Sequence, residues 1–165
     1  MASSSATAAV AAPGANRVAG TYLTFQVGAE EYGIEIFKVR EIIGMLPITP
    51  VPGSPPEMVG VINLRGKVIP VISIRTRFGM PTSEPHPHNV IIVVENLQGE
   101  IGIAVDRVAE VARFTEAETE PPPTYGLAVD TTCVAAIGKS QGRVRILLNI
   151  SRVLGETSVT SGSAA

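Results

Sequence analysis

Short runs of alternating apolar and polar residues, separated by glycine and proline, make up most of this chain. Tyr22–Val27 places Leu23, Phe25 and Val27 on one side, which is the period-two pattern of a half-buried β-strand. Glu30–Ile34 follows after a glycine and is expected to pair with that strand as a hairpin. The pattern therefore predicts a fold built almost entirely from short strands and turns.

The most apolar part lies mid-chain, where Val59–Leu64 and Val68–Ile74 flank Arg65-Gly66. Two apolar arms around a two-residue turn predict a β-hairpin. Valine, isoleucine and leucine fill both faces of the arms, so we expect strands that are covered on both sides. Pro70 has no backbone donor, which favours a place on an edge strand or at a β-bulge.

The same signals predict the remaining elements. Ile36–Ile43 suits a helical turn followed by a strand, and Ser151 is expected to cap a short helix through Leu154. The proline-rich stretch Pro47–Pro56 is expected to be an ordered connection. Further strands are predicted over Asn89–Asn96, Glu100–Asp106, Val108–Phe114, Val134–Lys139 and Arg143–Ile150.

An internal repeat organises these strands into two halves. Tyr32–Ile42 aligns with Ile101–Val111 at an offset of 69 residues, and Gly66-Lys67-Val68 aligns with Gly142-Arg143-Val144 at an offset of 76. Each half would hold about five strands, which is enough for a small barrel. Two barrels packed together leave a groove, and grooves between modules are common binding sites for partners.

Composition narrows the class of protein. The 165 residues are 45% hydrophobic and 17% charged, with a formal charge of −2, so we expect a folded protein without the basic surface that nucleic acid requires. Aromatic residues are 4% of the chain, too few for the stacking platforms that hold single-stranded nucleic acid. No apolar run approaches the roughly 20 residues of a membrane span, and a single cysteine fits a reducing cytoplasm.

The residues that could carry catalysis are isolated from one another. Cys133 has no histidine nearby in sequence and is expected to be a buried apolar residue. His86 and His88 lie in a proline-rich linker without a third ligand, and solvent-exposed loop histidines are the favoured interpretation. No glycine-rich phosphate loop precedes a helix. We therefore expect a non-enzyme without a cofactor or a metal.

The two ends of the chain differ in composition from the middle. Residues 1–19 and 156–165 are rich in small residues and lack periodicity, so we expect disordered tails around a folded domain over residues 20–155.

The segment Asn63–Ile72, N-L-R-G-K-V-I-P-V-I, resembles the CheW family of bacterial chemotaxis coupling proteins. The likeness extends over about Thr21–Leu154 and includes Glu31-Tyr32-Gly33-Ile34 and Ile101-Gly102-Ile103. It implies an all-β fold with short helices, made of two intertwined five-stranded SH3-like barrels around a hydrophobic seam. It also implies a non-catalytic adaptor that links chemoreceptor cytoplasmic tips to the regulatory domain of the histidine kinase CheA, at receptor arrays on the inner face of the membrane.

The resemblance also implies two binding surfaces. The receptor-binding groove should involve Val39, Glu41, Arg65 and Val111, and the kinase-binding surface should include Gly60, Asn89 and Val90. A helical receptor tip would lay its apolar face in the groove, where Glu41 and Arg65 could pair with one another or with the receptor.

One departure from the family pattern concerns Ser73. The family usually has an aspartate there, so a negative charge near Arg75 is missing. The alternative functions are an adaptor for a paralogous chemosensory pathway, such as pilus motility or surface sensing, and a small-barrel protein that binds a ligand or nucleic acid.

Overall fold

The computed structural model describes residues 19–81, 87–96, 99–122 and 131–154. The predicted tails, residues 1–19 and 156–165, lie outside these ranges except for Ala19, and so does His86. His88, the second histidine of the linker, lies within them and is exposed.

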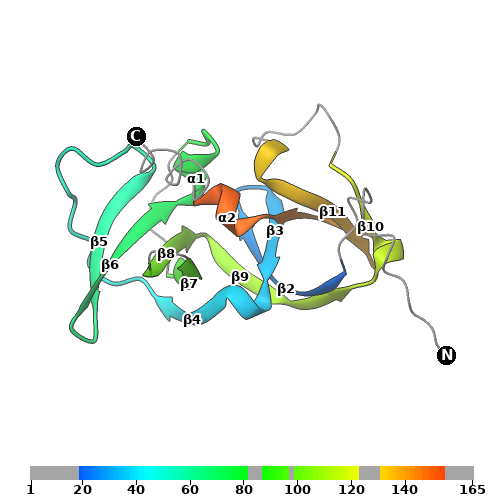
Figure 1. Cartoon of the computed structure of the whole chain (residues 1–165), viewed down its shortest axis with the longest axis horizontal. Coiled ribbons are helices and arrows are strands. Elements are labelled where there is room, and N and C mark those ends of the chain that lie inside the picture. Colours follow the sequence, from blue (N-terminus) through cyan, green and yellow to red (C-terminus); the bar gives the residue numbers. More distant parts are fainter. Residues whose placement is uncertain (1–18, 82–86, 97–98, 123–130, 155–165) are drawn as a thin grey trace.

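Two mostly antiparallel sheets lie side by side (Figure 1). The first contains, in spatial order, β4 (Val39–Gly44), β7 (Val90–Asn96), β8 (Gly99–Val105), β6 (Lys67–Ser73) and β5 (Met58–Leu64). The second contains β10 (Thr119–Glu120), β11 (Val134–Ser140), β12 (Arg143–Leu148), β3 (Glu30–Glu35), β2 (Gly20–Val27) and β9 (Arg107–Phe114). We call them the first and the second barrel.

Short helices complete the fold. The α-helices are α1 (Ile74–Arg77) and α2 (Ile150–Val153), and the 3-10 turns are η2 (Ile36–Lys38), η3 (Glu116–Glu118) and η4 (Thr131–Cys133). The prediction of an all-β fold with short helices and two intertwined SH3-like barrels is confirmed, with the two-residue strand β10 as a sixth strand in the second barrel.

The two barrels exchange a hairpin. The β2–β3 hairpin comes first in the chain but pairs in the second barrel, whereas the later β7–β8 hairpin pairs in the first barrel. Each exchanged hairpin is held by a parallel pairing, with Val71 opposite Gly102 and Leu147 opposite Gly33. These two pairings are related by the sequence offsets of 69 and 76 residues, so the repeat describes an approximate two-fold symmetry of the fold.

Three apolar clusters result from this exchange. One lies inside the first barrel around Ile69, Val71 and Ile91, and a smaller one lies inside the second barrel around Phe114 and Leu147. The largest cluster draws on both barrels and on the two α-helices. A strand such as β7 therefore packs one face inside its barrel and the other into the shared cluster, as its continuous apolar sequence predicts.

The hairpin turns are those that the sequence predicts. Arg65 and Gly66 have φ angles of 54° and 83°, and Gln141 and Gly142 have φ angles of 55° and 76°. Two successive residues with positive φ form the turn that best fits the twist of a two-residue hairpin. The repeat is thus preserved down to the backbone of the turns.

Several local predictions were wrong. Pro70 lies on a central strand, not at an edge or a bulge; it is tolerated because β8 pairs with β6 only from Val71 onward. The strand predicted to reach Ile74 ends at Ser73. The final helix is capped by Asn149, whose side chain accepts a hydrogen bond from the Arg152 N–H, and not by Ser151.

Glycine at the parallel pairings lets the exchanged strand approach. A Cβ at Gly102 would lie 2.7 Å from Ile91 Cγ2 and 3.3 Å from Val71 Cγ2. We expect Gly102→Ala to lower the unfolding free energy by about 1–3 kcal/mol, the usual cost of overpacking a core, as measured by urea denaturation. Gly44→Ala is the control, because a Cβ there meets nothing within 4 Å. Equal effects of the two variants would contradict this account of the exchange.

Candidate functional site

An exposed ion pair joins the tip of the β5–β6 hairpin to the outer strand β4. Arg65 Nη1 and Nη2 donate to the two carboxylate oxygens of Glu41 over 3.2 and 2.5 Å. The turn itself is fixed by Asn63, whose side-chain oxygen accepts a hydrogen bond from the Gly66 N–H over 2.9 Å. The hydrogen bonds from Arg65 hold the pKa of Glu41 below its ordinary value. The pair therefore stays ionised and forms a bidentate contact.

The two valines of the predicted receptor groove lie on different sheets. Val39 begins β4, two residues before Glu41, and packs half-buried against the shared apolar cluster. Val111 lies on β9, the outer strand of the second barrel, and its exposed fraction is 57%. The structure thus brings Glu41 and Arg65 into contact and places Val39 on the same strand as Glu41. Val111 shares no strand pairing with these three.

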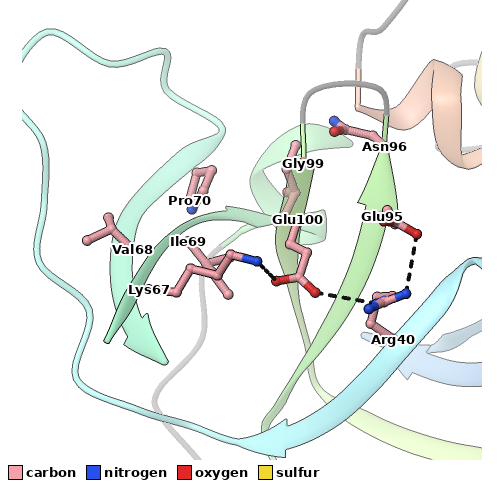
Figure 2. Close-up of a pocket in the computed structure, with 10 residues that line it drawn as sticks. Arg40, Lys67, Val68, Ile69, Pro70, Glu95, Asn96, Gly99 and Glu100 are labelled. Carbon is pink, nitrogen blue, oxygen red and sulfur yellow. Dashed lines mark hydrogen bonds and ion pairs between the residues drawn. The ribbon is translucent and has the colours of Figure 1, made fainter. Parts of the chain in front are cut away.

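A hollow of about 380 Å³ lies on the same barrel, between β6 and β8 (Figure 2). Glu100 Oε1 accepts a hydrogen bond from Lys67 Nζ over 3.0 Å, and its other oxygen lies 3.4 Å from Arg40 Nε. Arg40 also lies 3.5 Å from Glu95. Sequence reasoning missed Arg40 and Glu100, because each looks like an ordinary charge on a strand. The apolar part of the lining comes from Val68, Ile69, Pro70 and Ile101.

Gly60 is buried and supports a surface without being part of it. Its φ angle is 154°, and a Cβ there would lie 2.3 Å from the carbonyl oxygen of Thr49. Thr49 and Val61 exchange two backbone hydrogen bonds of 2.9 Å across this contact. Because Gly60 has no side chain, the connection between β4 and β5 can lie directly against strand β5.

Val90 begins strand β7, and Asn89 comes directly before it. The Asn89 side-chain amide donates to the carbonyl oxygen of Asp106 over 2.9 Å, and Val90 pairs with Gly44 at the end of β4. Asn89 and Val90 are both half-buried. Each is therefore held in place and still reaches the surface.

An apolar hollow of about 280 Å³ brings Asn89 together with the strand that carries Gly60. Val59, next to Gly60, lines it with an exposed fraction of 40%, and Met45 lines it with 45%. The sequence signal that could have predicted this hollow is the presence of two large apolar residues, Met45 and Val59, on either side of the proline-rich connection. Ile48, Ser73, Arg75, Thr76, Ala104, Val105 and Asp106 complete the lining.

Asp106, which lines this hollow, forms hydrogen bonds with Arg75 beside the hollow and with Gly28 in the second barrel. Its carboxylate accepts hydrogen bonds from Arg75 Nε over 3.0 Å, from Arg75 Nη2 over 2.7 Å and from the Gly28 N–H over 2.8 Å. Partial burial alone would raise the pKa of Asp106, but the bonds from Arg75 and Gly28 lower it overall. Arg75 thus has a partner without an aspartate at Ser73, whose hydroxyl instead caps α1 by accepting from the Thr76 N–H.

The described residues include few candidates for a nucleophile or a metal ligand. Cys133 is fully buried, and its sulfur lies 3.4 Å from the Arg77 guanidinium. In the described part of the chain, no three His, Cys, Asp or Glu side chains gather where they could hold a metal ion. Among the described helices, none is long and apolar enough to span a membrane.

The first barrel thus carries an apolar hollow and a second hollow with a charged lining, which are features of a module that binds other molecules. Comparison with known proteins identifies the family. The model of the CheW-like domain matches residues 21–158, so the chain belongs to the CheW family, as its resemblance in sequence predicts.

The individual relatives agree. The chain is 33% identical to chemotaxis protein CheW of Rhizobium meliloti, covering 79% of this chain and 84% of the relative. It is 35% identical to that of Klebsiella aerogenes, covering 81% and 80%. The crystal structure of the scaffolding protein TtCheW from Thermoanaerobacter tengcongensis superposes with a TM-score of 0.75 at 35% identity, covering 82% of this chain and 88% of that one.

The Arg75–Asp106 pair makes stability depend on pH. Because the folded-state pKa of Asp106 lies below its ordinary value of about 3.9, the pair stabilises the fold above that pH, and this stabilisation is lost as pH falls through the lowered pKa. Asp106→Asn should cost about 1–3 kcal/mol of unfolding free energy at pH 7 in urea titrations. The gap to the parent should narrow below about pH 4.

Glu120→Gln is the control for this prediction. It removes a carboxylate from an exposed pair with Lys139 and should leave the unfolding free energy almost unchanged. A gap between Asp106→Asn and the parent that stays constant from about pH 7 to about pH 3 would show that Asp106 acts through packing and not through its charge.

Proposed function

We propose that this protein is a non-catalytic adaptor of bacterial chemotaxis. It joins the cytoplasmic tips of chemoreceptors to the regulatory domain of the histidine kinase CheA, in the cytoplasm at receptor arrays. Family membership supports the adaptor role. The observation that carries the two-partner proposal is the presence of two distinct surfaces on the first barrel: the Arg65–Glu41 pair at one end of β5 and the apolar hollow around Val59 at the other.

The two surfaces lie at opposite ends of strand β5. Val59 and Arg65 are six residues apart along β5 and its turn, which at about 3.3 Å per residue corresponds to roughly 20 Å. Each surface also matches a different partner. A fixed ion pair beside apolar strand residues suits a helical hairpin, and an apolar hollow suits the projecting side chains of a second barrel domain.

The receptor surface consists, on this proposal, of Val39, Glu41, Arg65 and Val111. Val111 is an exposed apolar residue on an outer strand, and Glu41 and Arg65 supply directional hydrogen bonds. Apolar contacts would provide affinity, and the ion pair would set the position of the receptor helices.

Arg65→Glu tests the receptor surface. The variant places two carboxylates side by side, so we expect capture of a receptor cytoplasmic fragment to weaken at least tenfold in a titration, while capture of the CheA regulatory domain stays within twofold of the parent. Lys139→Glu is the matched control, because it breaks another exposed ion pair on the second barrel. A second control, Arg65→Glu with Glu41→Arg, restores a pair of reversed polarity and should not restore capture. Unchanged capture by Arg65→Glu would refute this surface.

The kinase surface consists of the hollow that Gly60 supports and that Asn89 borders, together with Val90 on the adjoining strand. Met45 and Val59 give it apolar contacts. Asp106 accepts a hydrogen bond from Asn89 at its carbonyl oxygen and from Arg75 at its carboxylate, so both side chains at the rim of the hollow have a fixed partner.

Val59→Glu tests the kinase surface. A carboxylate in this hollow loses its water on docking, and Arg75, the cation in the lining, is already paired with Asp106. Capture of the CheA regulatory domain should therefore weaken at least tenfold while receptor capture is retained. Val144→Glu is the control, since Val144 is an exposed valine on the second barrel. The opposite pattern, with receptor capture lost and kinase capture kept, would exchange the two assignments.

A further inference from the structure

A third hollow, of about 330 Å³, adjoins the apolar hollow at Val59. Asn89 lines both of them, so the two hollows meet at the start of strand β7. We call the third one the basic hollow, because its lining includes Arg107 and His88 and, among the described residues, no carboxylate. The rest of its lining is Gly44, Pro87, Val90 and Val108.

The basic hollow accounts for Val90 as a member of the predicted kinase surface. Val90 is not part of the described lining of the apolar hollow, although Asn89 is. Both residues line the basic hollow. The predicted kinase residues Asn89 and Val90 therefore come together here, whereas the apolar hollow alone explains only one of them.

Arg107 differs from the arginines at the other hollows, because those arginines have acidic partners. Arg75 at the apolar hollow binds Asp106, and Arg40 at the largest hollow lies near Glu100, as Figure 2 shows. Within the described part of the chain, no carboxylate forms an ion pair with Arg107, which is exposed. Its guanidinium therefore remains available to an acidic group from outside.

The carboxylate nearest in sequence to Arg107 is bound by other groups. Asp106 comes directly before Arg107, but it lines the apolar hollow and accepts hydrogen bonds there from Arg75 and the Gly28 N–H. Consecutive residues of an extended chain point to opposite sides, which agrees with the place of Asp106 in one hollow and Arg107 in the other. The junction of β8 and β9 thus provides a neutral ion pair to the apolar hollow and an unpaired cation to the basic hollow.

We infer that the basic hollow is the second half of the kinase surface, where Arg107 binds a carboxylate side chain of the CheA regulatory domain. The inference rests on the proposed kinase surface at Gly60, Asn89 and Val90. The planar guanidinium of Arg107 can donate two hydrogen bonds to one carboxylate, and Val90 and Val108 provide apolar contacts beside it. The partner would thus place an apolar side chain in one hollow and an acidic side chain in the adjoining one.

Three substitutions at Arg107 separate the effect of its charge from that of its size. Arg107→Lys keeps the positive charge, Arg107→Gln removes it and Arg107→Glu reverses it. Capture of the CheA regulatory domain by the full chain is measured by titration, and a melting transition is recorded for each variant. We expect Arg107→Lys to bind within about threefold of the parent, Arg107→Gln to bind about threefold to tenfold more weakly, and Arg107→Glu more weakly still.

The salt dependence of binding gives a readout that a loss of packing alone would not change. The association rate of the parent should fall between about 0.05 M and about 0.5 M NaCl, because salt screens exposed charges. Arg107→Gln should show a weaker dependence on salt, since it lacks one of those charges. Equal capture by Arg107→Lys and Arg107→Glu, or an unchanged salt dependence in Arg107→Gln, would overturn the inference.

Arg113→Gln is the matched control. Arg113 is an exposed arginine near the other end of β9, and it lines neither of the two hollows. It also forms no ion pair with any described carboxylate. Both variants change the net charge equally, so Arg113→Gln should capture the kinase domain within about twofold of the parent. Equal weakening by Arg107→Gln and Arg113→Gln would indicate a general effect of net charge and would contradict a specific contact.

Val59→Glu separates a failure of this inference from a failure of the proposed function. If Val59→Glu weakens kinase capture and the Arg107 variants do not, the kinase surface stands without the basic hollow. If none of these variants weakens kinase capture, the proposed kinase surface is wrong and this inference falls with it. Loss of receptor capture by Arg107→Glu, with kinase capture retained, would assign the basic hollow to the receptor and overturn the inference.

Discussion

The parallel contact between an exchanged hairpin and its host strand is the constraint on which the whole fold depends. Gly102 against Val71 and Gly33 against Leu147 close the two barrels, and neither barrel can form from its own half of the chain. Because each half completes the other, the barrels share one large apolar cluster and behave as one folded unit. A rigid body of this kind can hold two partners in a defined relation, which a flexible pair of domains could not.

The approximate symmetry of the fold does not extend to its charged side chains. In the first barrel Glu41 is bound by Arg65, which is exposed at the hairpin tip. In the second barrel Arg145, which is 2% exposed, binds both Glu31 and Glu110, and the Glu110 side chain itself is 46% exposed. The two repeats therefore present different polar groups at corresponding places on the surface.

Much of the fold was predictable, because strand alternation and turn residues are local signals. The repeat, the Arg65-Gly66 turn and the doubly covered strands can be read directly from the sequence. The hairpin exchange cannot, since it is a choice between distant partners. Pro70 and Ser151 were misplaced because the pairing of a strand can change partway along it and because Asn149 competes for the same cap.

The site was less predictable than the fold. Resemblance supplied Glu41 and Arg65, which are in contact, and Gly60, which is buried beneath Thr49. The hollow at Met45 and Val59 joins residues from separate elements, and a buried arginine in an alternating strand looks like a surface charge until its partners are known.

Simultaneous binding of both partners tests the central claim most directly. A receptor cytoplasmic fragment, this adaptor and a CheA regulatory domain are mixed, and the masses of the complexes are measured by analytical ultracentrifugation. The account predicts a ternary complex in which saturating receptor changes the affinity for the kinase domain by less than about threefold. Mutual displacement of the two partners would mean that they share one surface, and would contradict it.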